Sequence, residues 1–277
     1  MGFVVIRITD IRLSQALILT PRDTGQGALT MKVIYSHSFY PVYTSDPAAA
    51  AGRMEAVMNA LPKNAELVEA EPATEQQLLL AHTPDHIDWV RREGLYEIAA
   101  LAAGGAVQTA HLGLEAPAFG AIRPPGHHAS SDSCWGFCYF NNMAVALLAL
   151  KQEGRIETAS VLDFDLHFGD GNVDILEHRN WVTLFNPASQ NRDAYLKGVE
   201  SFLVDYPADV IGISAGFDNH CDDWGGLLHT EDYHAMGRMA LRSIQSNDSG
   251  CFAILEGGYN HSVLGLNAAA LIEGMTL

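Results

Sequence analysis

The sequence predicts an α/β protein: a single domain of three layers, with helices on both faces of a mainly parallel sheet. Short β-rich runs alternate with helical segments from Met31 onward, and this alternation is typical of parallel sheets. The 277 residues, 48% of them hydrophobic, are enough to fill one large core. Polar motifs follow several of the apolar runs, which places them at the edge where open α/β sheets bind ligands.

Seven runs predict the strands, because β-branched and aromatic residues are concentrated in each. In chain order they are "MKVIYS" (31–36), "AELVEA" (65–70), "AFGAIR" (118–123), "SVLDFD" (160–165), "WVTLFN" (181–186), "DVIGISAG" (209–216) and "CFAILEGG" (251–258). Helical segments lie between them, for example "AAGRMEAVMNAL" (50–61) and "NNMAVALLALKQEG" (141–154), where apolar residues recur at helical spacing. We expect one domain over residues 31–277. Residues 1–30 do not join the alternation, and we interpret them as an N-terminal extension ahead of a start at Met31.

The composition narrows the classes of partner. Subtracting 33 acidic residues from 16 basic ones gives a net charge of −17, which repels phosphate backbones and attracts cations. We therefore expect no nucleic-acid partner. No run approaches the roughly 20 apolar residues of a membrane span, and Arg7, Asp10 and Arg12 interrupt any signal-like segment. We expect no membrane partner and a cytoplasmic protein.

The cysteines predict free thiols in a reducing compartment rather than a disulfide framework. There are four, at positions 134, 138, 221 and 251, and they form no CxxC pair. A zinc site at Cys134 and Cys138 is disfavoured, because the cysteines of such sites are usually closer together.

The stretch "VLDFDLHFGDGN" (161–172) predicts a metal site. Asp163, Asp165 and His167 alternate along it, so in an extended strand they project from one face while Phe164 and Leu166 pack behind. Asp165 and His167 supply an oxygen and a nitrogen ligand, and Asp218 in "SAGFD" adds a third from another strand end. Three such ligands leave a position for water, as in catalytic zinc sites. Helix capping is the alternative role for each single acid.

Two further motifs predict acid–base and electrostatic groups beside the metal. His127 and His128 follow "RPPG", and the spare acids Asp163 and Asp170 can each accept a ring N–H and raise the basicity of one histidine. Tyr259 follows two glycines, and its phenol can donate a hydrogen bond to a developing oxyanion. In "CWGFCYF" (134–140), Phe137 and Trp135 offer aromatic walls, although ordinary packing explains Trp135 equally well.

The motifs "RPPGHH", "GFCYFNN", "DFDLHFGDGN", "SAGFD" and "EGGY" occur in this order over most of residues 31–277. Together they resemble the histone deacetylase and acetylpolyamine amidohydrolase superfamily, in particular its bacterial, class II-like members. The resemblance implies the arginase-deacetylase fold and one catalytic zinc held by Asp165, His167 and Asp218. It also implies catalytic roles for His127, His128 and Tyr259.

The resemblance assigns further residues. It pairs Asp163 with His127 and Asp170 with His128, makes Phe137 with Gly136 part of the acyl channel, and places Arg53 on an internal path for acetate release. The sequence also departs from the family pattern. The run "TLFNPAS" (183–189) replaces the segment that usually holds a structural potassium ion, which puts that site in doubt. The usual acid that grips the substrate backbone has no clear match, and Glu93 is the nearest candidate.

The leading hypothesis is a zinc-dependent amidohydrolase that acts on linear amide bonds and removes acetyl groups from acetylated amines. We favour acetylpolyamines or related small cationic amines, because Asp222 and Asp223 follow Asp218 closely and could bind a second ammonium at the channel mouth. They could equally be solvated loop acids. An acetyl-lysine side chain on a protein is the alternative substrate, and the oligomeric state, including a homo-oligomer, stays open.

Two other hypotheses are weaker. A dimanganese hydrolase of the arginase or agmatinase type needs a carboxylate two residues after the metal-binding histidine, and here Asp170 comes one residue too late. His220 could still bind a second metal, so metal stoichiometry would decide. A silent acetyl-lysine binding module is disfavoured, because every predicted catalytic side chain is present, and a turnover assay would separate it from an enzyme.

Overall fold

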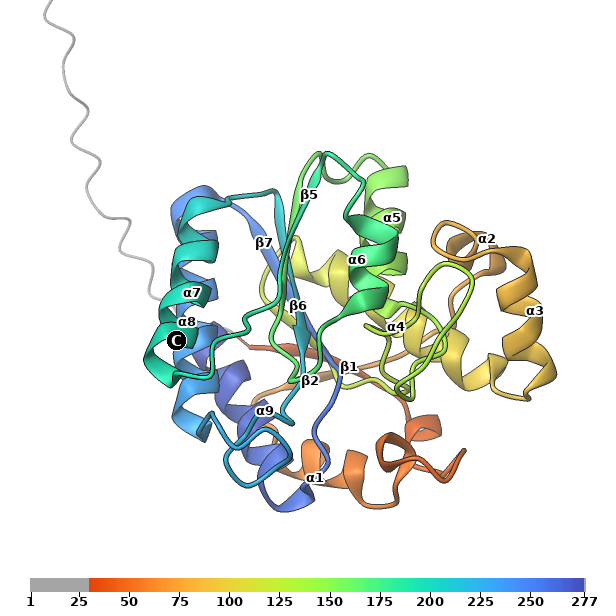
Figure 1. Ribbon diagram of the computed structural model, residues 1–277, viewed down its shortest axis with the longest axis horizontal. Coiled ribbons are helices and arrows are strands. Elements are labelled where there is room, and N and C mark those ends of the chain that lie inside the picture. Colours follow the sequence, from red (N-terminus) through yellow and green to blue (C-terminus); the bar gives the residue numbers. More distant parts are fainter. Residues whose placement is uncertain (1–29, 277) are drawn as a thin grey trace, which may run out of the picture.

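The computed structural model describes residues 30–276, which form one seven-stranded sheet between two helical layers (Figure 1). The strand order is β2-β1-β3-β7-β6-β4-β5, and every pairing is parallel. The strands are β1 (Lys32–Tyr35), β2 (Glu66–Glu69), β3 (Ala118–Gly120), β4 (Ala159–Asp163), β5 (Val182–Phe185), β6 (Val210–Ala215) and β7 (Gly250–Leu255). The predicted three-layer α/β/α fold is confirmed. The predicted extension lies outside the described residues except for residue 30.

Helices cover both faces of the sheet. They are α1 (Arg53–Ala60), α2 (Glu75–Leu78), α3 (Pro84–Arg92), α4 (Tyr96–Gly113), α5 (Asn142–Gln152), α6 (Asp170–Leu176), α7 (Arg192–Asp205), α8 (Thr230–Asn247) and α9 (His261–Thr276). Helix α4 packs against α5 and against β1, β3 and β7, while α8 packs against α7, α9 and the other side of β7 (Figure 1). The central strands β4, β6 and β7 are buried at every position, as expected for parallel strands covered on both sides.

The sheet order brings four loops together. Strands β3, β7, β6 and β4 are neighbours, and their carboxyl ends lead into residues 121–141, 256–260, 216–229 and 164–169. These loops contain the motifs from which the sequence predicts a site, so the topology places those motifs at one edge.

One local expectation is wrong. Strand β4 ends at Asp163, so Asp165 and His167 do not lie in an extended strand. The reason is that the Asp165 carboxylate accepts backbone N–H groups, that of His167 two residues on at 2.9 Å and that of Gly257, on the loop after β7, at 2.8 Å. Such side chain–backbone bonds compete with the strand ladder. Phe164 is buried as expected.

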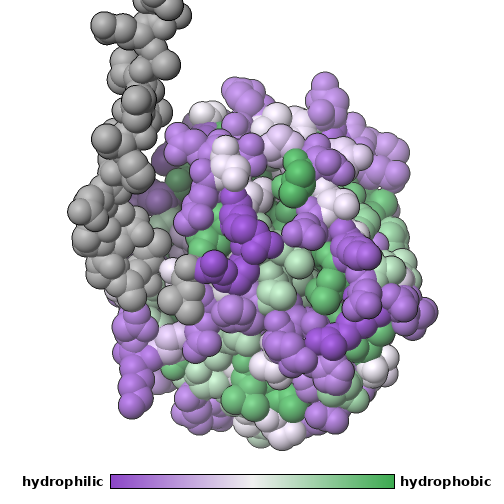
Figure 2. Space-filling model, turned by 90° about the vertical axis from the view of Figure 1, so that its left-hand side faces the viewer, coloured by the Kyte–Doolittle hydropathy of each residue, from purple (hydrophilic) through white to green (hydrophobic). Residues whose placement is uncertain are grey.

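Other features of the described residues bear on the predictions. All four cysteines are free. Among residues 30–276, none of the helices combines the length and apolar character that a membrane span requires. Figure 2 shows the face that carries α7 and α8, where hydrophilic side chains predominate and apolar ones form small separate groups.

Candidate active site

Asp165, His167 and Asp218 form a compact group at the loop edge of the sheet. The Nδ1 atom of His167 lies 3.0 Å from Asp218 Oδ2 and 3.3 Å from Asp165 Oδ1. One ligand atom from each residue lies within 4.8 Å of the others. Both aspartates are buried, whereas His167 is partly exposed. The structure thus brings the three predicted metal ligands together, with the histidine on the side open to solvent.

The electrostatics of this group favour a positive charge at its centre. The hydrogen bond to Asp165 and the close carboxylate of Asp218 raise the pKa of His167 to about 10. Burial and the charge of Asp165 raise the pKa of Asp218 to about 6. Two buried carboxylates this close repel each other, and a proton on His167 offsets the repulsion. A divalent cation would offset it more strongly.

A metal ion fits these residues. Asp218 Oδ2 is buried and makes no hydrogen bond within the described residues. It lies 3.0 Å from His167 Nδ1, which brings the carboxylate close to the imidazole. The contact is not a hydrogen bond, because its angles do not fit one. A buried oxygen without a donor is costly unless a cation satisfies it. One imidazole nitrogen with two carboxylates is a ligand set that suits zinc.

Two histidine–aspartate pairs stand beside the metal-binding group. His127 Nδ1 lies 3.3 Å from Asp163 Oδ2, and His128 Nδ1 lies 2.7 Å from Asp170 Oδ1. The two imidazole centroids are 3.9 Å apart. Asp170 begins α6, and Asp163 ends β4. The arrangement places the pairs in the combinations that the family resemblance implies.

The two histidines have opposite pKa shifts. Burial disfavours the charged form of His127, but Asp165 and Asp163 outweigh burial and raise its pKa well above the usual value. Burial and the positive charge of His127 lower the pKa of His128 to about 4. At neutral pH His127 is therefore cationic and His128 neutral, which separates a charge-stabilising group from a proton acceptor.

Trp135 contacts both members of the second pair. Its indole N–H donates to Asp170 Oδ2 at 2.7 Å, and its ring centroid lies 3.9 Å from that of His128. Burial favours the protonated form of Asp170, yet the hydrogen bonds from His128 and Trp135 lower its pKa. The sequence alone did not decide whether Trp135 forms an aromatic wall of the site or packs in the core. Nothing in "CWGFCYF" indicates that its indole bonds to Asp170, 35 residues away.

Gly136 and Phe137 make a tight turn over His128. Both have positive φ, 59° at Gly136 and 67° at Phe137. A Cβ atom on Gly136 would lie 2.4 Å from His128 Cδ2, so only glycine fits there. Phe137 adopts a backbone conformation that costs a side-chain-bearing residue about 1 kcal/mol, which marks a constrained position. Its ring meets the Tyr259 ring edge-on, with centroids 5.9 Å apart.

Tyr259 belongs to a loop that packs on the metal-binding group. Gly257 packs directly on the ligands, since a Cβ atom there would lie 2.5 Å from Asp165 Oδ2 and 2.9 Å from Asp218 Oδ2. Burial and the charges of Asp165 and Asp218 raise the pKa of Tyr259, so the phenol keeps its proton and can donate it in a hydrogen bond. The exposed ring of Trp224 stacks on the phenol ring at 4.0 Å.

Asp223 is not a free carboxylate, contrary to expectation. Its Oδ2 accepts the backbone N–H groups of Tyr259 and Asn260, each at 2.8 Å, and its Oδ1 accepts that of Trp224 at 2.9 Å. Asp223 therefore holds the tyrosine loop, whereas Asp222 is exposed. The sequence could not show this, because the loop that Asp223 binds follows a different strand.

Arg53 and Glu256 are buried beside the site, and each holds one of its loops. Arg53 is fully buried, and its Nε donates to the carbonyl oxygen of Gly258 at 2.9 Å. Glu256, which sequence reasoning missed, accepts the backbone N–H groups of Gly126 and His127 at 2.7 and 3.2 Å. Burial raises its pKa to about 7. The one sequence feature that could have indicated Glu256 is its position directly after the apolar run "CFAIL".

The remaining predicted residues lie apart from the metal-binding group. Glu93 follows α3 and is exposed, and within residues 30–276 no hydrogen bond or ion pair involves its side chain. His220 groups with Cys221 and Asp222 rather than with the metal ligands. Its Nδ1 accepts the backbone N–H of Asp222 at 3.1 Å. His220 therefore belongs to a separate group of possible metal ligands and is not grouped with Asp165, His167 and Asp218.

Comparison with known proteins agrees with this geometry. The family model "Histone deacetylase domain" matches residues 89–195. A probable deacetylase of Archaeoglobus fulgidus is 28% identical over 249 residues, 70% of this chain and 69% of the relative. A histone deacetylase-like amidohydrolase of Pseudomonas aeruginosa is 27% identical over 298 residues, covering 83% and 78%. A polyamine deacetylase, HDAC10, of Danio rerio is 23% identical over 291 residues, covering 78% and 41%.

A solved structure shows the same fold. The HDA15 HD domain superposes with a TM-score of 0.77 at 23% identity, over 88% of this chain and 89% of that one. The parallel sheet, the matched domain and the deacetylase relatives lead to one conclusion: the chain has the fold of a histone deacetylase domain and is similar in sequence to deacetylases of the histone deacetylase and acetylpolyamine amidohydrolase superfamily.

Proposed function

We propose that this protein is a zinc-dependent deacetylase that hydrolyses acetylated amines, with acetylpolyamines or related small amines as its preferred substrates. The observation that carries the proposal is the pair of histidine–aspartate contacts beside a buried group of metal-ligand type. The deacetylase relatives support the hydrolytic activity. Zinc and the choice of amine are our inference.

Asp165, His167 and Asp218 would hold the zinc ion. A bound zinc ion supplies Lewis acidity, which activates the attacking water and polarises the acetyl carbonyl. His128 is neutral at pH 7, because its pKa is about 4, so its free ring nitrogen can take a proton from that water. The hydrogen bond from Nδ1 to Asp170 fixes the tautomer that leaves the other nitrogen free.

Two further side chains act on the substrate. The protonated Tyr259 donates a hydrogen bond to the carbonyl oxygen as negative charge develops on it. Either His128, after it has taken the proton, or His127 then protonates the leaving amine. The products are acetate and a cationic amine.

Charge and one relative support the choice of amine. The net charge of −17 favours cationic ligands over anionic ones. The relative from Danio rerio is named a polyamine deacetylase. Acetyl-lysine peptides are also cationic, so they are the main alternative.

The test is a comparison of kcat/KM for acetylputrescine, acetylcadaverine, acetylspermidine and acetyl-lysine peptides, combined with elemental analysis of the purified protein. We expect one zinc per chain and higher kcat/KM for the acetylated amines. Two tightly held manganese ions per chain, or no turnover of any acetylated amine, would contradict the proposal.

A further inference from the structure

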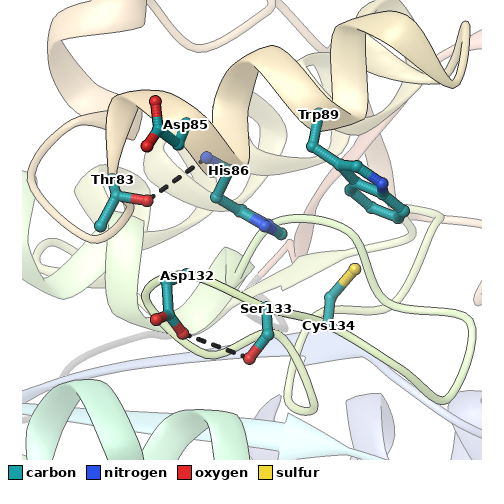
Figure 3. A pocket seen from close by; sticks show the side chains of 7 residues that line it. All are labelled: Thr83, Asp85, His86, Trp89, Asp132, Ser133 and Cys134. Atoms are coloured by element: carbon teal, nitrogen blue, oxygen red, sulfur yellow. Dashed lines mark hydrogen bonds between the residues drawn. The ribbon is translucent and has the colours of Figure 1, made fainter.

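A cavity of about 580 Å³ lies beside the candidate active site, between α3 and the loop of residues 131–134 (Figure 3). Its lining consists of Thr83, Asp85, His86, Trp89, Asp132, Ser133 and Cys134. The next residue after this loop is Trp135, which stacks on His128. Cys134 of the lining thus directly precedes a residue that contacts His128, and we call this cavity the α3 cavity.

The α3 cavity carries negative charge that nothing in its lining offsets. Asp85 and Asp132 contribute two carboxylates, and neither forms an ion pair with any lysine or arginine of residues 30–276. Burial lowers the pKa of His86, so its ring is neutral at pH 7. Burial also raises the pKa of Cys134 to about 11, so its thiol is neutral too. A cation is the ligand that this charge favours.

His86 adds a hydrogen-bond acceptor. It is only 3% exposed, and its Nε2 donates to the carbonyl oxygen of Tyr139 at 2.7 Å. Since a carbonyl can only accept, the proton sits on Nε2 and Nδ1 keeps its lone pair. Within the described part of the chain, Nδ1 has no hydrogen-bond partner. An acceptor that lines a cavity without a protein donor can accept an N–H or O–H group from a ligand.

Trp89 supplies an aromatic surface. Its ring stacks on His86 with centroids 5.9 Å apart, and it remains 38% exposed at the cavity. A tryptophan face attracts alkylammonium groups and packs well against methylenes. Carboxylates, an imidazole acceptor and an indole face together suit an ammonium on an alkyl chain, and they disfavour anions.

We propose that the α3 cavity binds the distal ammonium of an acetylated polyamine while the acetyl group occupies the metal site. This inference rests on the proposed function and specifies its substrate: an amine long enough to pass Trp135. A lysine or arginine side chain of an acetylated peptide has the same chemistry, so the experiment must separate the two sources.

The first experiment compares Asp85→Asn, Asp132→Asn and the double variant on acetylspermidine and on a neutral N-alkylacetamide of equal length. We expect KM for acetylspermidine to rise about two- to fivefold for each carboxylate, the range for exposed ion pairs, and KM for the neutral substrate to stay unchanged. Asp205→Asn, at the end of α7, removes the same charge far along the chain and is the control. Equal effects on both substrates, or the same effect from Asp205→Asn, would overturn the proposal.

The second experiment locates the amine without relying on turnover. Cys134 lines the cavity, whereas Cys138 and Cys251 are each only 1% exposed. In a Cys221→Ser background, free spermidine should slow the labelling of Cys134 by a neutral maleimide. The protection should disappear in the Asp85→Asn/Asp132→Asn double variant. Labelling rates that do not respond to spermidine would contradict occupancy of the cavity.

The outcomes separate this inference from the proposed function. Unchanged KM for acetylspermidine in the Asp85→Asn and Asp132→Asn variants, without protection of Cys134, leaves a deacetylase whose amine site is elsewhere. Protection of Cys134 in a protein that deacetylates nothing supports the cavity and contradicts the proposed function. If the two aspartates matter only for acetyl-lysine peptides with a neighbouring basic residue, the occupant is a peptide cation and the polyamine assignment is wrong.

Discussion

Asp170 bonds to two different rings, and this sharing explains why its geometry is well defined. One oxygen accepts from His128 and the other from the Trp135 indole. A carboxylate held at both oxygens cannot rotate away from the imidazole, so His128 keeps one orientation. Trp135 therefore acts as a positioning residue for the acid–base pair.

This role can be tested with Trp135→Phe, which keeps an aromatic ring over His128 but removes the N–H donor. We expect kcat to fall about tenfold, since a hydrogen bond to a charged group is worth about 1.5–3 kcal/mol, with little change in KM. Metal content should not change. If kcat stays normal, the indole only packs on the histidine. An additional Asp170→Asn substitution should remove most of the effect, because both changes break the same contact.

Tyr259→Phe tests the stabilisation of the oxyanion. The proposed role of the phenol hydroxyl is to stabilise the negative charge that develops on the carbonyl oxygen during the reaction. The substitution should therefore lower kcat about 10²- to 10³-fold while KM and zinc content change little. Steady-state kinetics and elemental analysis measure these quantities. Near-normal kcat would show that another group polarises the carbonyl.

Zinc binding should depend on pH through His167. Its pKa is about 10 in the metal-free protein, so at neutral pH a proton occupies the nitrogen that the metal needs. The proton must leave on binding, and apparent zinc affinity should therefore rise about tenfold per pH unit between pH 7 and 9. Below about pH 6 the dependence should steepen, because Asp218 then binds a proton as well. Chelator competition at several pH values measures this, and a flat profile would count against His167 as a ligand.

At the scale of elements, the loops after β6 and β7 behave as one unit. Asp223 on the first loop accepts two backbone N–H groups of the second, and Trp224 stacks on Tyr259. Arg53, at the start of α1, holds the second loop from the opposite side through the Gly258 carbonyl. The position of the catalytic tyrosine thus depends on three separate segments of the chain.

Asp223→Asn should therefore act on turnover rather than on charge recognition. An asparagine oxygen replaces only one of the two acceptor oxygens, so the tyrosine loop should loosen and kcat should fall about three- to tenfold. The fall should be the same for acetylputrescine and for a neutral acetamide. A rise in KM limited to the cationic substrate would instead restore the original expectation of an ammonium contact.

The elements were largely predictable from the sequence, whereas the contacts between loops were not. Each of the seven strands coincides with a predicted run to within one residue at its start, and the central strands, which are buried on both faces, leave the clearest apolar signal. The metal ligands and the two histidine–aspartate pairs could also be predicted from the sequence, because they follow those strands closely. The roles of Trp135, Asp223 and Glu256 depend on partners from other loops. Strand β4 also ended early, because the Asp165 side chain bonds to the backbone around it.

At the scale of the whole molecule, the fold gathers buried acids at one edge of the sheet. Asp163, Asp165, Asp218 and Glu256 are all at most 5% exposed. Burying several carboxylates is unfavourable unless cations or hydrogen bonds compensate. A bound metal should thus contribute to the stability of the entire domain.

Removal of the metal should therefore lower the melting temperature. A ligand at 100 to 1,000 times its Kd stabilises by about 2.7–4.1 kcal/mol, which corresponds to a shift of roughly 5–15 °C for a domain of this size. Thermal unfolding with and without a chelator measures the shift. Asp218→Ala, which removes a ligand, should reduce it strongly, whereas Asp205→Asn should leave it intact. An unchanged shift in Asp218→Ala would place the stabilising metal elsewhere.

The placement of the tryptophans has a spectroscopic consequence. Of four tryptophans, Trp135 lies on His128, Trp224 lies on Tyr259, and Trp89 lines the α3 cavity. Indole emission responds to nearby charge and to exclusion of water, so the fluorescence of this chain is weighted towards its reaction site. Ligand binding to the unmodified protein should therefore change its tryptophan fluorescence. Replacing these three tryptophans one at a time would distinguish a ligand bound over the histidines from one bound in the cavity.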